Sequence, residues 1–228
     1  MKKVIVVFGY GPGISTAVAR RFGAEGFAVA LVSRNGARLE AGVAALAAQG
    51  VEAAAFTADA ADPAAVRRAI GEARARFGAI DVIEWTAYTA VAADLTTASP
   101  EELRAIFDVP VLGLTTAIQA ALPDLKRSAQ AAVLVTNGGL GFFDPAADRA
   151  GVDWNAMGLS VANSAKHKLV RLLALKLKPE GVFVGEVVVT SVVKGTAFDS
   201  GNGTLDADLV ASAFWKLYSA RDRTSVTI

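Results

Sequence analysis

Three glycines near the amino terminus have the spacing of a phosphate-binding loop. Gly9, Gly11 and Gly13 follow a short run of Val, Ile and Phe, and Ile14 leads into a helical pattern that begins at Ser15. Glycine lets a backbone turn sharply and approach a phosphate without a Cβ in the way, and the free N–H groups at a helix start bind anions. This context favours a nucleotide site over a tight turn without a ligand. Tyr10, which lies between the glycines, is expected to belong to the same site.

A second group of residues follows the next two apolar runs. Ser33, Arg34 and Asn35 end the second run, about 20 residues beyond the glycines. An acidic residue there binds the ribose of NAD, whereas an arginine suits the 2′-phosphate of NADP. Asp59, followed by Ala60, is placed to accept a hydrogen bond from adenine, although it could equally be a turn residue. The sequence therefore predicts NADP as the cofactor, with NAD less favoured.

Few side chains further along the chain could transfer a proton. Lys166 lies in a long helical pattern, where it could hold a sugar hydroxyl or be an exposed lysine. Tyr88 ends the fourth apolar run, at the sheet edge where ligands bind, so its hydroxyl is a candidate acid. His167, the only histidine, is one helical step of about 100° from Lys166, and we expect a structural or solvated role for it.

Alternating strand and helix patterns must position these residues. Apolar runs predict strands over 4–8, 28–33, 51–58, 81–87, 132–136, 182–189 and 225–228. Longer patterns predict helices over 15–22, 37–49, 62–77, 99–122, 160–178 and 206–220. Pro110 should kink or split the fourth helix. Apolar strands that alternate with helices predict an α/β fold, a doubly wound parallel sheet of the Rossmann type, with all 228 residues in a single domain.

Composition narrows the possible partners. The 23 basic and 22 acidic residues give a net charge of +1 without a basic run, so neither nucleic acid nor a membrane surface is expected as a partner. The chain has no cysteine, and we predict no metal site. The first apolar run is too short for a signal peptide, and no stretch reaches the roughly 20 residues of a membrane span. These features predict a soluble cytoplasmic protein.

Along nearly its whole length the chain resembles the short-chain dehydrogenase/reductase family. The family motif Thr-Gly-x-x-x-Gly-Ile-Gly reads Phe-Gly-Tyr-Gly-Pro-Gly-Ile-Ser here, so Ser15 replaces the last glycine. The family's Asn-Asn-Ala-Gly reads Trp-Thr-Ala-Tyr, which puts Thr86 and Ala87 beside the cofactor. Thr196 falls at the threonine that touches the nicotinamide carboxamide. The resemblance implies an NADP-dependent oxidoreductase with a small carbonyl or alcohol substrate.

The family's catalytic residues are mostly replaced. Its active-site asparagine falls on Pro110 and its serine on Gly138, and Tyr-x-x-x-Lys has Ala162 in place of tyrosine and keeps Lys166. In the family the tyrosine protonates the developing alkoxide, the serine positions the carbonyl, and the lysine holds the nicotinamide ribose. Alanine and glycine can neither donate this proton nor orient the carbonyl. We therefore expect a degenerate catalytic site, with Lys166 and Tyr88 as its candidate catalytic residues.

Three functions stay open on this reading. The first is an oxidoreductase that uses an unconventional acid, such as Tyr88 or a water molecule. The second is a non-catalytic nucleotide-binding or interaction protein on the same scaffold. The third is a methyltransferase, because the Gly-Tyr-Gly-Pro-Gly sequence of this chain also resembles the glycine loop of that class. This alternative is least favoured, because that class usually has an acidic residue just before the glycines and another at the end of the second strand. Those places hold Val7 and Phe8, and Ser33 and Arg34, in this chain.

The long helices should also carry an interface. The patterns over 99–122 and 160–178 place Ala, Leu and Val on much of their surface. The equivalent helices of the resembled family form a two-fold interface. We therefore predict a homodimer or homotetramer through an isologous contact.

Overall fold

A single seven-stranded sheet organises the computed structural model, which describes residues 2–228. Every strand pair is parallel, in the order β3-β2-β1-β4-β5-β6-β7. The strands are β1 (Val4–Phe8), β2 (Ala28–Ser33), β3 (Ala53–Thr57), β4 (Val82–Trp85), β5 (Ala132–Gly138), β6 (Phe183–Val189) and β7 (Ser225–Thr227). This order confirms the predicted Rossmann-type fold, in which ligands bind where the winding reverses, between β1 and β4.

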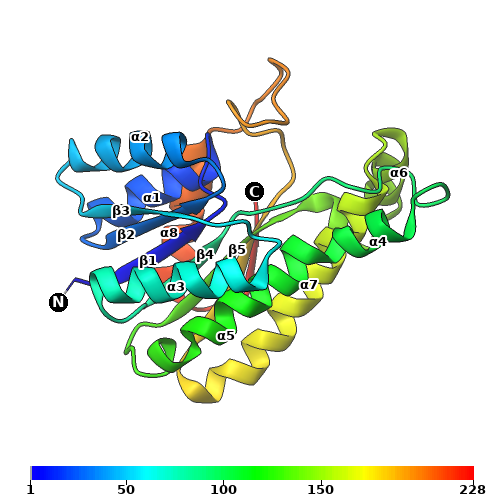
Figure 1. The fold of residues 1–228 in the computed structure, drawn as a ribbon. Coiled ribbons are helices and arrows are strands. Elements are labelled where there is room, and N and C mark those ends of the chain that lie inside the picture. The colour runs from blue at the N-terminus through cyan, green and yellow to red at the C-terminus, as the bar shows by residue number, and fades with distance from the viewer. Residues whose placement is uncertain (1) are drawn as a thin grey trace.

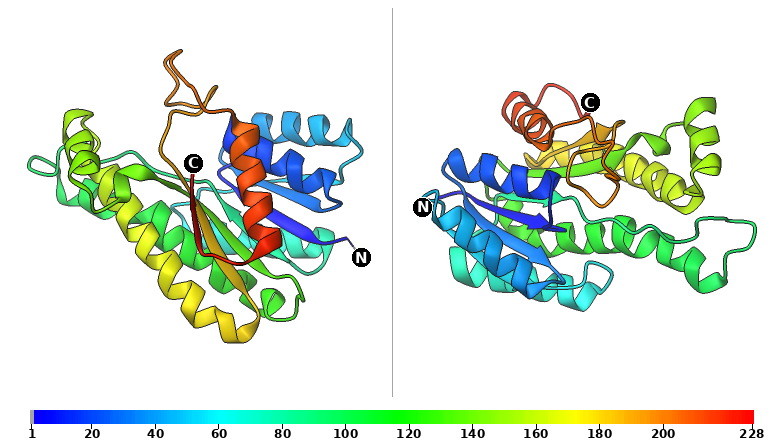
Figure 2. Two further views of the ribbon diagram at one scale, coloured as in Figure 1. Left: turned by 180° about the vertical axis from the view of Figure 1, so that it is seen from behind. Right: turned by 90° about the horizontal axis from the view of Figure 1, so that it is seen from above.

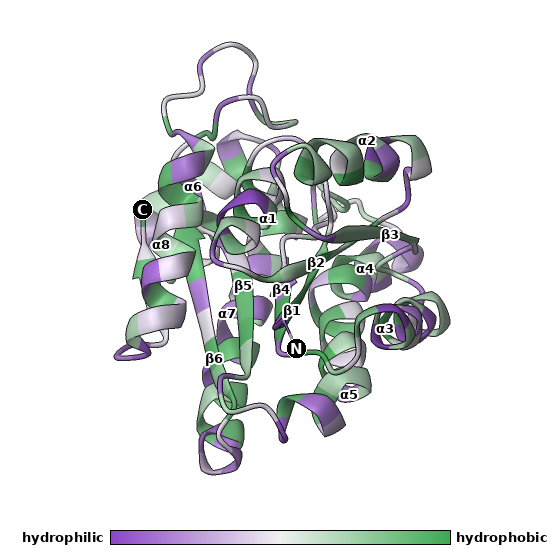
Figure 3. Cartoon of the chain, turned by 90° about the vertical axis from the view of Figure 1, so that its left-hand side faces the viewer, coloured by the Kyte–Doolittle hydropathy of each residue, from purple (hydrophilic) through white to green (hydrophobic). Residues whose placement is uncertain are grey.

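Helices cover both faces of the sheet (Figures 1 and 2). One face carries α1 (Ile14–Ala24), α2 (Gly36–Ala47) and α8 (Ala207–Ala220). The other carries α3 (Pro63–Phe77), α5 (Leu114–Leu125) and α7 (Met157–Leu177). The central strands are apolar and almost fully buried, as a parallel sheet covered on both sides requires (Figure 3).

The predicted helix starts are confirmed by their caps. Asp62 accepts from the N–H two residues on and precedes a proline, and Ser99 forms a capping box with Glu102 at the start of α4 (Pro100–Phe107). Asp206 caps α8 in the same way as Asp62 caps α3. Short polar side chains thus fix where three of the helices begin.

Pro110 splits the long helix less sharply than expected. It lies in a π-helical segment, η1 (Asp108–Gly113), that joins α4 to α5, so the helical run extends from Pro100 to Leu125. This run is long and apolar enough to cross a membrane, contrary to the sequence expectation, with a mean hydropathy of 1.6. Half of that apolar window is buried inside the fold, and α5 packs against α3 and β4, as a core helix does.

Sequence reasoning missed three short helical segments and misplaced several ends. The sequence patterns predict no helix between 136 and 160, but the region after β5 contains the short helices η2 (Gly139–Gly141) and α6 (Pro145–Asp153). Asp144 caps α6 ahead of a proline, the same signal that located α3. Strands β3 and β4 are shorter than predicted, and α7 begins three residues earlier than the predicted start at Ser160. A further short helix, η3 (Lys178–Glu180), follows α7.

Candidate functional site

The crevice at the carboxyl ends of β1 and β4 brings together four of the predicted cofactor residues. Gly9 has a φ of +82°, and a Cβ there would lie 2.5 Å from the backbone nitrogen of Ala87. Gly13 has a φ of +88°, and a Cβ there would lie 2.5 Å from Cγ2 of Thr196. Neither position accepts a side chain without strain. The glycine loop therefore touches the segments that follow β4 and β6, where a dinucleotide lies in such sheets.

Hydroxyl groups brace this loop from within. The N–H of Gly11 donates to Oγ of Ser15 at 2.9 Å, and the Ser15 hydroxyl lies 3.2 Å from the Gly9 carbonyl oxygen. Thr16 donates to the Gly11 carbonyl oxygen at 2.7 Å. Helix α1 begins at Ile14 without a side-chain cap. The first N–H groups of α1 thus stay available for a phosphate.

A groove of about 320 Å³ lies between the glycine loop and α2. Asn35 accepts from the N–H of Arg38 at 3.0 Å and caps α2, so its side chain has a structural role. Arg34 is exposed and makes no ion pair within residues 2–228. Arg38 brings its guanidinium to 3.5 Å from where a Cβ of Gly11 would be. Arg38 was not predicted; it lies in the first turn of α2, whereas Arg34 precedes the extended Asn35 cap.

The other predicted cofactor residues line the edges of this region. The ring of Tyr10 is buried against α2, since a Cβ on Gly42 would lie 2.5 Å from its Cε1. Ser33 has a buried Oγ without a hydrogen-bond partner within residues 2–228. Asp59 accepts from the N–H two residues on at 2.9 Å, so one of its oxygens holds a turn, and Ala60 beside it is half-buried. The packing of Tyr10 makes it a wall of the groove.

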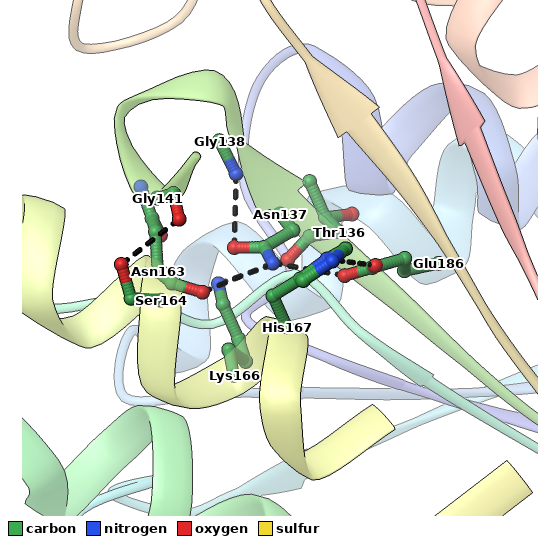
Figure 4. Close-up of polar contacts among 9 residues, drawn as sticks. All are labelled: Thr136, Asn137, Gly138, Gly141, Asn163, Ser164, Lys166, His167 and Glu186. Carbon is green, nitrogen blue, oxygen red and sulfur yellow. Dashed lines mark hydrogen bonds and ion pairs between the residues drawn. The ribbon is translucent and has the colours of Figure 1, made fainter. Parts of the chain in front are cut away.

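Lys166 is buried at the carboxyl end of β5 rather than exposed on its helix. Its Nζ donates to the carbonyl oxygen of Thr136 at 2.9 Å (Figure 4). Burial lowers the pKa of Lys166 from 10.5 to about 8, and the nearby carboxyl groups of Glu186 and Glu84 oppose that shift. A lysine so placed can hold a sugar hydroxyl and can also exchange a proton near neutral pH.

His167 and Lys166 belong to one polar cluster on the inner side of α7 (Figure 4). His167 contacts Glu186 of β6, which is fully buried. Asn137 of β5 donates to Glu186 at 2.9 Å and to the backbone oxygen of Asn163 at 3.2 Å. The structural role expected for His167 thus takes the form of a contact with a buried carboxyl group, which its sequence position did not reveal.

A second polar cluster joins β4 to β5 and was missed by sequence reasoning. Glu84 is fully buried, and its Oε1 contacts the hydroxyls of Thr86 and Thr136, the latter at 3.2 Å. The two hydroxyls lie 2.7 Å apart. Burial raises the pKa of Glu84 from 4.5 to about 8, against the lowering effect of both hydroxyls and of Lys166. Its position inside an apolar strand was the one signal that the sequence offered.

The place of the family serine is occupied by an amide. A Cβ on Gly138 would lie 2.6 Å from Nδ2 of Asn163, so the side chain of Asn163 reaches into the space that a serine hydroxyl would use. Asn163 directly follows Ala162 and is buried. Glycine at position 138 and asparagine at position 163 are thus sterically coupled.

The place of the family tyrosine is covered. Ala162 is buried against Ala92 and Ile106. The loop that carries Ala92 is held on the start of α7, because Gly158 donates to the Ala92 carbonyl oxygen at 2.8 Å. Ala92 has a φ of +52°, an uncommon conformation for alanine. The loop after β4 therefore packs over the position from which a tyrosine would act.

Tyr88, the other candidate acid, lies on the outer side of the crevice. Its ring packs against Phe198 with a centroid distance of 5.1 Å, and the two rings are 44% and 51% exposed. Phe198 follows Thr196 in the segment between β6 and α8. The pair joins the segments that follow β4 and β6, so Tyr88 is accessible but is held by an aromatic neighbour.

Comparison with known proteins agrees with this geometry. A family model described as short chain dehydrogenase matches residues 3–202. Meso-2,3-butanediol dehydrogenase of Serratia marcescens is 32% identical over 185 residues, which are 81% of this chain and 69% of that protein. A 3-dehydrosphinganine reductase of Arabidopsis thaliana is 37% identical over 121 residues, 53% of this chain. The chain spans only 36% of the length of that reductase.

Solved structures share the fold over the full length. An alcohol dehydrogenase from the archaeon Thermococcus sibiricus, complexed with 5-hydroxy-NADP, has a TM-score of 0.82 and 25% identity over 100% of this chain and 96% of its own. An NADPH-bound short-chain oxidoreductase from Pseudomonas aeruginosa with an atypical catalytic center has a TM-score of 0.86 and 21% identity, covering 99% and 95%. The chain belongs to the short-chain dehydrogenase/reductase family of oxidoreductases. This membership leaves the methyltransferase alternative without support.

Proposed function

We propose that the chain is an NADP(H)-dependent oxidoreductase with a weakened catalytic site, which acts on a small carbonyl or alcohol. The observation that carries the proposal is the intact dinucleotide crevice, with Gly9 against Ala87 and Gly13 against Thr196, beside the buried Lys166. Bound NADP(H) supplies hydride chemistry in this family. The residues of this chain would bind the phosphates at the start of α1 and hold the nicotinamide ribose through Lys166.

The preference for NADP over NAD rests on two arginines. Arg38 lines the groove beside Gly11, and Arg34 is exposed just before the Asn35 cap of α2. An arginine pair suits a phosphate better than a ribose hydroxyl. Removing a charge-assisted phosphate contact costs on the order of 1.5–3 kcal/mol. Calorimetric titration should show tighter binding of NADP than of NAD, with Arg34→Ala and Arg38→Ala each weakening NADP alone.

The exposed Arg149 of α6 provides a matched control, because Arg149→Ala removes a charge away from this groove. Equal affinity for NAD and NADP in the unchanged protein would contradict the cofactor assignment. So would an NADP affinity that Arg34→Ala and Arg38→Ala both leave intact.

The catalytic weakness follows from the residues at positions 138 and 162. Without a tyrosine hydroxyl, the proton for the substrate oxygen must come from another donor, such as Tyr88 or a water molecule. Loss of a general acid typically costs about 10²–10⁴-fold in rate. We expect slow reduction of ordinary ketones and aldehydes despite measurable NADPH binding. Turnover of a carbonyl panel at ordinary enzyme rates would show the site to be intact.

A non-catalytic role is the second candidate, favoured by one observation. The loop after β4 packs Ala92 over Ala162, where a reacting group would need space. A protein that binds NADPH but transfers no hydride in a long single-turnover incubation would fit this role. Any hydride transfer to a carbonyl that depends on Lys166 would exclude it.

A homodimer or homotetramer is proposed from the exposed side chains of two neighbouring helices. Leu103 and Phe107 of α4 and Leu172 and Leu175 of α7 are exposed, and the two helices are in contact. Light scattering at tens of micromolar should give a multiple of 23.5 kDa. Leu175→Glu should shift the protein toward monomer, whereas Leu209→Glu, on the exposed side of α8, should not. A monomer before any change would contradict the proposal.

A further inference from the structure

The cluster of Glu84, Thr86 and Thr136 is a hydrogen-bonded path from the interior to the crevice. Glu84 is fully buried, whereas both threonines are partly exposed. The carboxyl group contacts both hydroxyls, which lie 2.7 Å from each other. Proton exchange along this path needs no rearrangement of heavy atoms, because each hydroxyl can accept one hydrogen bond while it donates another.

The outer end of this path lies near Lys166 and the glycine loop. The backbone oxygen of Thr136 accepts from Nζ of Lys166 at 2.9 Å, so one residue belongs to both groups. Thr86 immediately precedes Ala87, which the glycine loop contacts at Gly9. The path therefore opens between the glycine loop and Lys166, where the proposed nicotinamide ribose would be held.

We propose that Glu84, acting through the hydroxyls of Thr86 and Thr136, supplies the proton that the missing tyrosine would give to the substrate oxygen. This inference rests on the proposed reductase function. In the reduction, the carbonyl carbon gains a hydride from the reduced nicotinamide and the π pair moves to the oxygen. That oxygen takes the proton of the Thr136 hydroxyl. Glu84 replaces that proton, directly or through Thr86, and the resulting carboxylate regains one from solvent.

Glu84 and Glu186 differ in their direct partners. Lys166 lies near both Glu84 and Glu186, but Glu186 also contacts His167 and accepts from Asn137. Glu84 has two neutral hydroxyls as its direct partners, and its Oε2 has no hydrogen-bond partner within residues 2–228. A buried carboxyl group with neutral partners favours the protonated form, whose pKa here is raised to about 8.

Infrared spectroscopy tests the protonation without any substrate. At pH 7 the protein, alone and with NADPH, should show the C=O stretch of a protonated carboxyl group, which fades as the pH rises past 8. Glu84→Gln should remove this band. The matched control is Asp124→Asn, which should leave it in place, since Asp124 is equally buried but paired with Arg74 at 2.6 Å and Arg127 at 2.7 Å.

Kinetics test the transfer itself, with 2,3-butanedione as an activated dicarbonyl probe. Glu84→Gln and Thr136→Val should each lower the single-turnover rate of NADPH oxidation at least tenfold and leave the NADPH dissociation constant within about twofold. Glu84→Gln should make the pH dependence near 8 shallower, because only Lys166, whose pKa is also about 8, then titrates there. A rate that survives both changes but is lost with Tyr88→Phe would overturn the inference.

The binding titration separates the two failures. A protein that does not bind NADPH would contradict the proposed function. If the protein binds NADPH but shows no infrared band of a protonated carboxyl group that Glu84→Gln removes, the proposed role of Glu84 is overturned and the proposed function is not.

Discussion

The glycine loop and the amino-terminal half of α7 both depart from the family pattern, and the structure accommodates the two departures differently. At the loop, the hydroxyl of Ser15 bonds to the backbone of Gly11 and Gly9, and the open start of α1 is kept. At α7, Asn163 takes the space beside Gly138, and a loop packs over Ala162. Hydrogen bonds thus brace the loop in the first region, whereas in the second glycine and alanine stand where the family pattern has hydroxyls, and neighbouring groups pack against them.

The comparison teaches that a binding site and a catalytic site tolerate substitution to different extents. Phosphate binding needs backbone N–H groups and a close approach, which a braced loop provides whatever side chain braces it. Proton donation needs one group at one place. Neighbouring residues can restore it only by offering another titratable group, and Glu84 and Lys166 are buried groups whose pKa values are each shifted to about 8.

The largest expected effect is a gain in the rate of carbonyl reduction when the family's catalytic hydroxyls are returned to the chain. The triple change Gly138→Ser, Ala162→Tyr and Asn163→Ala returns both family hydroxyls and removes the amide that a side chain at position 138 would meet at 2.6 Å. The rate of carbonyl reduction should rise about 10²–10⁴-fold. The same triple change with Phe instead of Tyr at position 162 is the control, because it adds the ring without the proton. Equal rates for the two would show that Lys166 does not act on a hydroxyl at that position.

The next effect concerns the close approach at Gly9. Gly9→Ala puts a Cβ 2.5 Å from the backbone of Ala87 at a φ of +82°, so we expect a loss of about 2–4 kcal/mol in the free energy of unfolding. Gly26→Ala has a similar φ of +89° with nothing within 4 Å, and should cost only about 1 kcal/mol. Urea unfolding of the pair isolates the contact. Equal losses would mean that the crevice is looser than the structure indicates.

A smaller effect should follow from removing the loop's brace. Ser15→Ala leaves the Gly11 N–H without its partner in a buried place, at a cost of roughly 1–3 kcal/mol. Thr16→Val, which removes a hydroxyl that only donates to the Gly11 carbonyl oxygen, should cost less. Both are measured by urea unfolding and NADPH titration. If Ser15→Ala improved NADPH affinity and stability together, the serine would be a defect and not a brace.

The smallest effect is a pH dependence of stability. The pKa of Glu84 is raised in the folded state, so the folded protein binds this proton more tightly than the unfolded chain. The stabilisation that Glu84 adds to the free energy of unfolding is therefore fully present below about pH 4.5, and it is lost as the pH rises through about 8. Between pH 6 and 8 the protein should lose about 2 kcal/mol relative to Glu84→Gln. A constant difference across this range, measured by urea unfolding, would show that the folded state does not hold the proton.

Local sequence signals determined most of the fold and the binding half of the site. Apolar strands alternating with capped helices specify a parallel sheet, and the glycines at its first turn specify where a dinucleotide can lie. The same kind of signal, an aspartate before a proline, marks α6 as clearly as it marks α3. The start of α6 was therefore predictable from the sequence alone.

The tertiary structure alone decided which polar groups meet. Glu84 and Thr136 are far apart in the sequence but adjacent across β4 and β5, and Lys166 reaches them from α7. Burial then sets their protonation, because a charge removed from water shifts its pKa according to every partner around it. The periodicity of apolar residues in the sequence shows that a residue is buried in the core, but it does not show which residues surround it there. The side chain of Asn163 in the serine's place and the loop over Ala162 are consequences of packing, which no local pattern encodes.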